Sequence, residues 1–447
     1  MPFRRPDFAW FIGVSVLLTL MIAVGRAADV TAAQVQELLE QNRRLQEQVR
    51  SQQQTIEGLN AKMSEVLRAS ERHERELRGL SDRVEAAGAV APVRAGNRGH
   101  EVRVSGETGI AFFNTGIEGQ FPKSEFRADD PVIAIEAPIR KNTYIFTELK
   151  LLMRESNLEN FQLGEMYVDF ENVSEAWGMP GLLNFRAGRV NIPFGEEYQV
   201  RGPVANPLIS HSLADVWGTD EGVEIYGRIG AAQYALAVQN GGVSRLRDFN
   251  ADKSVAARVS WDPARWLHLS GSAMRTGEIA SVADNLSEVW FANGFFRSVA
   301  PGGRATSFWV TLQEVDAMAR WKNGHLSGTL GGARYADNDR VADNSRGFHY
   351  RTLEAVQDIS GGFYGALRYS DIRVARGYPL AGWGAMGQFF FRPTLTTGLQ
   401  RTSVGLGYRF GPPLVLKFEY AWESGRTASG LRRDKEDFFG TELGVKF

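Results

Sequence analysis

The side chains of this 447-residue chain that could do chemistry are charged groups gathered in one long connecting segment, residues 193–217. The segment contains two adjacent acids, a third acid, a histidine and an arginine: Glu196, Glu197, Asp215, His211 and Arg201. Arg201 is its one full cation, because histidine is mostly neutral at pH 7. Charged side chains of both signs that line a pore attract ions of opposite charge. This set therefore predicts electrostatic contacts with small charged solutes.

A second set of cations comes from the polar faces of the predicted strands. These arginines are Arg103, Arg186, Arg228, Arg258 and Arg409. One interpretation is that they contact anions, because a guanidinium group pairs with phosphate or carboxylate through two parallel hydrogen bonds. The other is that they form salt bridges inside the protein with Glu107, Glu224 and Glu419. The sequence leaves both interpretations open.

Nothing else in the sequence supports catalysis, a metal or a cofactor. The chain has no Cys, and its six His are not spaced as metal ligands. It contains neither a Gly-x-Ser-x-Gly nor a His-Glu-x-x-His motif, and no phosphate-binding glycine loop. Glu196 and Glu197 near Asp215 could hold a divalent cation, although two acids beside a turn more often form a solvated face. With a net charge of −1, we expect no nucleic-acid partner, and we expect no enzyme activity.

The N-terminus predicts export. Arg4 and Arg5 precede an apolar run over residues 8–24, and the following GRAA sequence would allow cleavage after Ala27. We therefore expect a signal peptide over residues 1–27. The alternative is a retained membrane anchor, but the run is short for a span of about 20 residues. No Cys follows it, so a lipoprotein anchor is excluded.

Residues 28–87 are expected to form a coiled coil in the periplasm. An unbroken heptad runs from Val35 to Ala87, and twelve of its sixteen a and d positions are apolar. Such a narrow apolar stripe needs partner helices, so the heptad predicts a homo-oligomer and leaves dimer and trimer open. Residues 88–100, rich in Ala and Gly and containing Pro92, are expected to be a flexible linker.

Residues 101–447 predict an all-β transmembrane barrel. Leu414, Leu416, Phe418, Tyr420 and Trp422 alternate with Val415, Lys417, Glu419 and Ala421, which gives an apolar outer face and a charged inner face. A soluble sandwich would need the apolar face inside and has shorter strands. At about 20 to 22 residues for each strand with its connection, 347 residues give about sixteen antiparallel strands, enough to leave a water-filled pore.

The last strand ends on an aromatic residue. Leu443, Val445 and Phe447 share one face, and Glu442, Gly444 and Lys446 share the other. The terminal Phe447 resembles the assembly signal of bacterial outer-membrane barrels.

The connection around residues 193–217 is exceptional in length for a compact array of strands, which favours a functional loop. Residues 188–196 (GRVNIPFGE) run into the start of this connection, and residues 222–227 (GVEIYG) follow its end. Together they resemble the phosphate-selective porin O and P family. The resemblance implies a trimeric sixteen-stranded channel with its third external loop folded inward, and, in some members, anion preference and a periplasmic helix. The barrel region departs from the phosphate-specific members, since it has 37 basic and 40 acidic residues.

These observations predict a bacterial outer-membrane porin for passive diffusion of small hydrophilic solutes, with at most a mild anion preference. The alternative is a structural barrel that tethers the outer membrane to peptidoglycan, or to another periplasmic partner, through its coiled coil. A barrel enzyme would need an acid/base or Ser/His cluster at its rim, and the sequence offers none.

Overall fold

The computed structural model describes residues 101–119, 122–151, 161–200, 202–216, 218–241, 251–280, 304–378, 395–411 and 413–447. The predicted signal peptide, coiled coil and linker lie outside these residues, and so does Arg201. Within the described ranges, no helix is long and apolar enough to cross a membrane.

Strands dominate the described residues. The long strands are β1 (Arg103–Asn114), β2 (Glu125–Arg140), β3 (Thr143–Lys150), β4 (Gln162–Phe170), β5 (Asn184–Asn191), β6 (Thr219–Ile229), β7 (Ala232–Gln239), β8 (Ser254–Ala264), β9 (Leu267–Arg275), β11 (Ser307–Trp321), β12 (Gly324–Asp337), β13 (Arg346–Ser360), β14 (Phe363–Tyr378), β15 (Thr396–Gly411), β16 (Leu414–Thr427) and β18 (Phe438–Lys446). The short elements are β10 (Ile279–Ala280), β17 (Arg432–Arg433) and the 3-10 helices η2 (Val173–Trp177) and η3 (Glu197–Val200).

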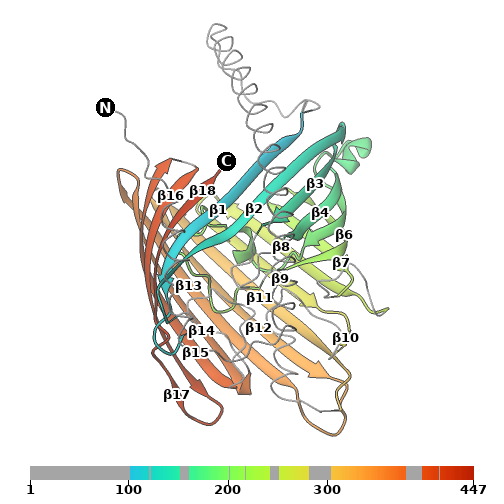
Figure 1. Cartoon of the computed structure of the whole chain (residues 1–447). Helices are drawn as coiled ribbons and strands as arrows, with labels where there is room; N and C mark the ends of the chain where they lie inside the picture. Colours follow the sequence, from blue (N-terminus) through green and yellow to red (C-terminus); the bar gives the residue numbers. More distant parts are fainter. Residues whose placement is uncertain are drawn as a thin grey trace, which may run out of the picture. The chain divides into compact units, whose positions relative to one another are not determined.

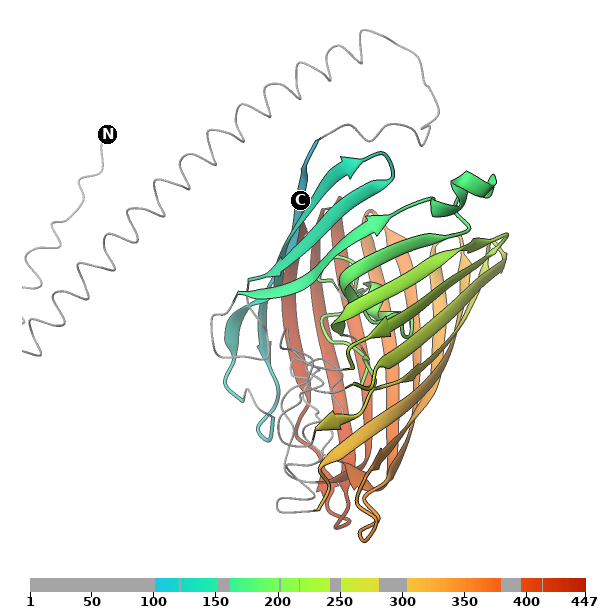
Figure 2. The same ribbon diagram turned by 90° about the vertical axis from the view of Figure 1, so that its right-hand side faces the viewer.

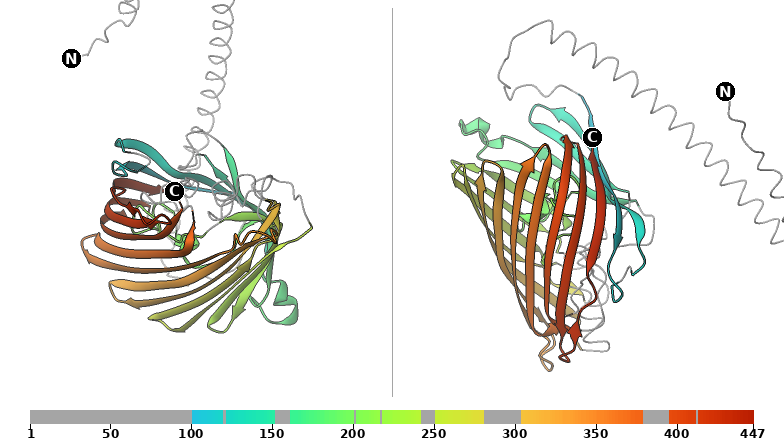
Figure 3. Two further views of the ribbon diagram at one scale, coloured as in Figure 1. Left: turned by 90° about the horizontal axis from the view of Figure 1, so that it is seen from below. Right: turned by 90° about the vertical axis from the view of Figure 1, so that its left-hand side faces the viewer.

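The long strands close into one ring (Figures 1 and 3). Each is antiparallel to its neighbours, β9 pairs with β11, and β1 pairs with both β2 and β18. At the closing seam, Gly109 lies opposite Asp129 on one side and Gly444 on the other. The described part of the chain is therefore a closed antiparallel barrel of sixteen long strands, as predicted.

Side chains alternate between the two faces of the ring. On β16, Phe418, Tyr420 and Trp422 are exposed on the outside, whereas Lys417 and Glu419 are buried on the inside. This confirms the orientation predicted for residues 414–422, with the apolar side chains outside and the charged side chains inside. Burial of charge on the inner face and exposure of aromatic groups on the outer face is the reverse of a soluble β-sandwich.

The connections differ at the two ends of the barrel. At the end that holds the C-terminus, several strand pairs are joined by two-residue turns (Figure 1). In the turn between β13 and β14, Gly361 and Gly362 have φ angles of 58° and 92°, which suit the tight hairpin turn that matches strand twist. At the opposite end the connections are longer, and the third of them joins β5 to β6.

Strands β11 to β16 have 14 to 16 residues and exceed the eight to ten residues over which the sequence alternates clearly. The reason lies at the end of the barrel with the longer connections, which we call the long-loop end, because the outer face becomes polar there. Arg351, Arg373 and Arg426 point outward at this end, and the strands that carry them remain hydrogen-bonded to their neighbours. Hydrophobic alternation therefore stops before hydrogen bonding between strands does.

The C-terminal residue takes part in the closing seam. The Phe447 N–H donates to the Gly106 carbonyl at 2.9 Å, and the Gly106 N–H donates to the Phe447 carbonyl at 3.0 Å. A Cβ at Gly106 would lie 2.5 Å from the Phe447 ring, so the ring covers this glycine. Phe447 remains 70% exposed at the outer surface.

We expect Phe447→Asp to lower the amount of heat-modifiable barrel in outer membranes, because the substitution removes the terminal aromatic group and keeps the backbone bonds to Gly106. Phe410→Asp is the matched control: Phe410 is also exposed, lies at the same end of the barrel and is not terminal. Electrophoresis of heated and unheated membranes measures the folded fraction. Equal losses in both variants would reject a specific role for the terminal residue.

Candidate functional site

The β5–β6 connection, residues 192–218, lies inside the barrel (Figure 2). The Gly195 N–H donates to Ser272 Oγ on β9 at 3.0 Å, and the Val204 N–H donates to Glu107 Oε1 on β1 at 2.6 Å. Strands β1 and β9 lie on opposite sides of the sixteen-stranded ring. One loop can contact both walls only by crossing the interior, which is the inward fold that the resemblance implied for the third external loop.

A buried carboxylate on β16 holds the tip of this inward loop. The Ile209 and Ser210 N–H groups each donate to Glu419 Oε2 at 2.7 Å, and Ser210 Oγ donates to Oε1 at 2.5 Å. Hydrogen bonds to an ionised acceptor are about twice as strong as those between neutral groups. Glu419 is thus the main polar anchor of residues 209 and 210.

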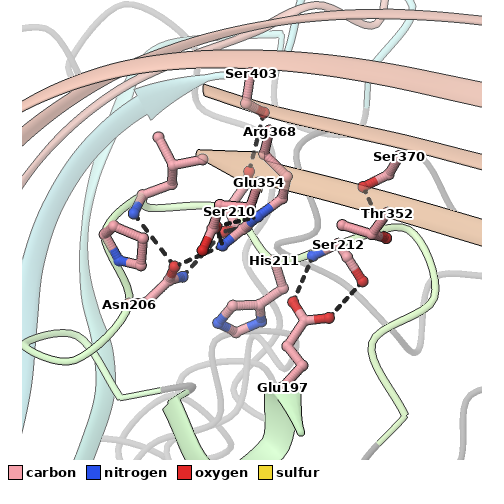
Figure 4. A network of polar contacts seen from close by, with 12 residues as sticks. Glu197, Asn206, Ser210, His211, Ser212, Thr352, Glu354, Arg368, Ser370 and Ser403 are labelled. Carbon is pink, nitrogen blue, oxygen red and sulfur yellow. Dashed lines mark hydrogen bonds and ion pairs between the residues drawn. The ribbon is translucent and has the colours of Figure 1, made fainter. Parts of the chain in front are cut away.

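Three buried cations surround that anchor, and each donates to a loop carbonyl while a neighbouring carboxylate balances its charge (Figure 4 shows Arg368 with its partners). The loop contacts are Arg368 to Ser210 O at 2.6 Å, Arg401 to His211 O at 3.1 Å and Lys417 to Leu208 O at 3.0 Å. The balancing acids are Glu354 at 2.5 Å from Arg368, Glu423 at 2.6 Å from Arg401 and Glu442 at 2.5 Å from Lys417. Because each buried charge has a partner, the network avoids the large cost of an unpaired ion.

Glycines on the inner wall make room for the same part of the loop. A Cβ at Gly440 would lie 3.1 Å from Ile209 Cδ1, and one at Gly444 would lie 2.6 Å from the Pro203 carbonyl oxygen. Gly405 faces the Leu208 side chain even more closely. Leu208 and Ile209 are consequently almost fully buried, which stabilises the docked loop by roughly 1.5–3 kcal/mol for each side chain.

The two ends of the loop are held by apolar packing. Phe194, Leu213 and Val216 join a buried cluster with inward side chains of β11 to β15, including Phe308 and Ile372. The inner face of β11 to β15 is therefore apolar in the half nearer the long loops. The inner faces of β16 and β18, by contrast, carry the charges that contact the loop tip.

The predicted acids of the loop separate into different contacts. Glu196 Oε1 accepts from Arg258 at 2.7 Å and lies 3.5 Å from His268 Nε2. Glu197 instead accepts from the Ser212 N–H at 2.7 Å and from Ser212 Oγ at 2.5 Å (Figure 4). Each carboxylate therefore has its own protein donors, and both side chains keep part of their surface exposed. Among the described residues, no group of three or more His, Asp and Glu could hold a metal ion.

His211 and Asp215 pair with each other. His211 Nδ1 lies 3.1 Å from Asp215 Oδ2, and both side chains are almost completely buried. Nearby, the Arg258 guanidinium lies 5.7 Å from the centre of the Tyr198 ring. Burial raises the pKa of Tyr198 to about 12, with Arg258 opposing the rise, so this phenol stays neutral. Of the predicted site residues around the loop, Glu196, Glu197 and Arg258 remain partly exposed.

Arg186 on β5 lies between two aromatic rings, at 4.7 Å from the Tyr167 centroid and 4.4 Å from that of Tyr226. It is 3.0 Å from Asp169 and 3.4 Å from Glu224, so this arginine forms salt bridges on the inner face.

The other candidate arginines lie apart from this group. Arg228 is exposed near the turn after β6, Arg103 is 4.0 Å from Glu136, and Arg409 is 2.6 Å from Asp358. Glu107 and Glu419, predicted as arginine partners, bind loop N–H groups instead.

The anchoring role of Arg368, Arg401 and Lys417 does not follow from the sequence. Their inward positions follow from strand alternation, and Lys417 and Glu419 were placed correctly on the inner face. Strand alternation does not predict which loop contacts these side chains, because the wall residues and their loop partners are about 150 to 210 residues apart in the chain. The inward glycines at 405, 440 and 444 were the available signal, because they mark where a second layer of chain approaches the wall.

The sequence matches no known family profile and no curated protein. Among solved structures, in-vitro folded OmpT, an outer membrane protein of Vibrio cholerae, has a TM-score of 0.52 at 10% identity, covering 77% of this chain and 97% of that chain. Its trimer form has a TM-score of 0.51 at 9% identity, covering 78% and 99%. An anion-selective porin from Comamonas acidovorans has a TM-score of 0.49 at 12% identity, covering 77% and 98%. The likeness to the two OmpT structures concerns the fold alone, which is that of an outer-membrane β-barrel.

Proposed function

We propose that this protein is an outer-membrane porin through which small hydrophilic solutes diffuse. The observation that carries the proposal is the loop of residues 192–218, which crosses the interior of a sixteen-stranded barrel and is anchored on both walls. A barrel of this size leaves an aqueous interior, and a loop across it sets the bore. A purely structural barrel has no need for a buried network that fixes a loop in its lumen.

The charges beside the loop support weak selectivity. Arg258 is paired with Glu196, and Arg186 is paired with Asp169 and Glu224. Paired charges give little net field, so we propose that any anion preference is mild. The phosphate-selective subtype, the role of Arg201 and the absence of enzyme activity stay predictions from the sequence.

In this proposal the short turns face the periplasm and the long loops face outside, the usual arrangement of bacterial outer-membrane barrels. A signal peptide over residues 1–27 would direct export. The trimer form of OmpT, which shares this fold, supports a homotrimer. The heptad over residues 35–87 favours an added role, in which the coiled coil contacts peptidoglycan or another periplasmic partner.

Deleting residues 202–209 should raise single-channel conductance, because these eight residues include Leu208 and Ile209, the tip of the inward loop. The control is deletion of residues 339–344, six of the eight residues of the β12–β13 connection, which lies mostly at the surface. Planar-bilayer recording compares the two with the parent. A conductance that rises equally in both, or in neither, would contradict a constriction by the β5–β6 loop.

Glu419→Ala should loosen the loop without shortening it. The substitution leaves the Ile209 and Ser210 N–H groups without their acceptor, at a cost of roughly 1–3 kcal/mol for each unsatisfied group. We expect noisier open channels and a higher mean conductance. Glu419→Gln keeps one carbonyl acceptor and should show a smaller effect. Channels of Glu419→Ala as quiet as the parent would mean that the anchor does not limit loop motion.

Arg258→Gln should shift selectivity toward cations, because it leaves Glu196 without its arginine. Glu196→Gln should shift selectivity the other way, and the double variant should return close to the parent. One uncompensated charge a few ångströms from an ion in water is worth about 1 kcal/mol, so each single shift in permeability ratio should be at most about fivefold. Reversal potentials in a salt gradient measure it. Unchanged potentials in both single variants would remove this pair from the proposed ion path.

A further inference from the structure

Four arginines form a patch on the outside of the barrel, toward the long-loop end. They are Arg334 on β12, Arg351 on β13, Arg373 on β14 and Arg426 on β16, and all four are exposed. Strand register places them on the outer face: Arg351 lies opposite Asp371, and Gly398 on β15 lies between Arg373 and Arg426. We call these four residues the arginine patch. The loop and the lumen described above make no use of it.

The patch begins where the apolar outer surface ends. The last outward apolar or aromatic residue before each arginine is Leu330 on β12, Leu353 on β13, Tyr369 on β14 and Trp422 on β16. The arginines follow two or four residues further toward the long loops, which is roughly 7–14 Å along the strands. Aromatic residues mark the edge of the hydrocarbon region in such barrels, so the arginines stand at the depth of lipid head groups.

Local contacts hold the guanidinium groups outward. Arg373 lies 2.8 Å and Arg351 lies 3.4 Å from the buried carboxylate of Asp371. A Cβ at Gly398 would lie 2.7 Å from an Arg373 terminal nitrogen, so the missing side chain leaves room for Arg373 to extend toward Arg426. Even with these contacts, the Arg351 and Arg373 side chains are 59% and 53% exposed and keep free hydrogen-bonding capacity.

Among the described residues, the charge of the patch is only partly balanced. In that part of the chain Asp371 pairs with Arg351 and Arg373, no carboxylate forms an ion pair with Arg334 or Arg426, and the nearby loop acids Asp434 and Asp343 pair with other arginines. Four cations over one acid leave a net charge of +3 on a surface next to the lipid. Guanidinium groups bind phosphate oxygens through paired hydrogen bonds, and this geometry suits a phosphorylated head group.

We propose that the arginine patch binds the phosphate groups of an anionic glycolipid in the outer leaflet of the outer membrane. The inference rests on the orientation in the proposed function, with the long loops outside. Anionic lipid attracts each nearby arginine by about 1 kcal/mol, so four arginines make a selective site. The apolar rows below the patch provide the adjoining surface for the acyl chains.

The test compares binding of two probes to the full-length protein in neutral detergent micelles. The probes are bisphosphorylated lipid A and fully dephosphorylated lipid A with the same acyl chains, and native mass spectrometry measures their apparent Kd values. We expect the parent to bind the bisphosphorylated probe more tightly. Arg334→Gln with Arg426→Gln should reduce that preference roughly thirtyfold, since two arginines that contribute about 1 kcal/mol each are removed. These two arginines are chosen because changing them leaves the contacts of Asp371 intact.

The matched control is Lys141→Gln with Arg265→Gln, which removes two exposed charges from short turns at the opposite end of the barrel. It should keep the parental preference. Equal affinity of the parent for both probes, or an equal loss in the control, would overturn the proposal. So would a patch variant that loses its oligomeric state but keeps its lipid preference, because the patch would then be a subunit contact. Channel conductance in phosphatidylcholine bilayers should be parental in the patch variant, so failure of the porin function is observed separately.

Discussion

Closure of the backbone hydrogen-bond ladder is the constraint on which the rest of this structure depends. In hydrocarbon an unpaired N–H or C=O group costs several kilocalories per mole, so an open sheet edge is excluded. Here β1 meets that requirement by pairing with β2 on one side and β18 on the other. Once the ring is closed, every strand has one face outside and one inside, and each side chain is assigned to lipid or lumen by alternation.

The inner face of the barrel also binds the β5–β6 loop. The tip of the β5–β6 loop brings N–H and C=O groups away from bulk water, and these groups need partners. The wall supplies Glu419 as acceptor and Arg368, Arg401 and Lys417 as donors, with Glu354, Glu423 and Glu442 balancing the cations. Such a network ties the loop to one position, because moving it would leave Glu419 and several buried N–H and C=O groups without hydrogen-bond partners at once.

This use of charge explains how the barrel can be rich in arginine and still have little free positive charge near the inward loop. The lumenal arginines closest to the loop are engaged with carboxylates or with loop carbonyls, and little free positive charge remains there. On the outer surface the balance differs. Beyond the apolar band, Asp371 pairs with two of the four patch arginines, Arg351 and Arg373, so the unbalanced positive charge of the described residues lies on the outer face of the barrel rather than in its lumen.

The sequence by itself determined the barrel, its approximate strand number and the inward or outward position of most strand residues, because a strand in a closed barrel must alternate with period two. It also singled out residues 193–217 by length, and it placed Arg186 and Glu224 on the inner faces of their strands. Only the tertiary structure decided which wall the loop meets. Glu419, Arg368 and Gly405 touch the loop across more than 150 residues of chain, and no local pattern encodes a contact of that range. The buried pairing of His211 with Asp215 likewise depends on how the loop folds inside the ring, because burial is a property of the assembled walls.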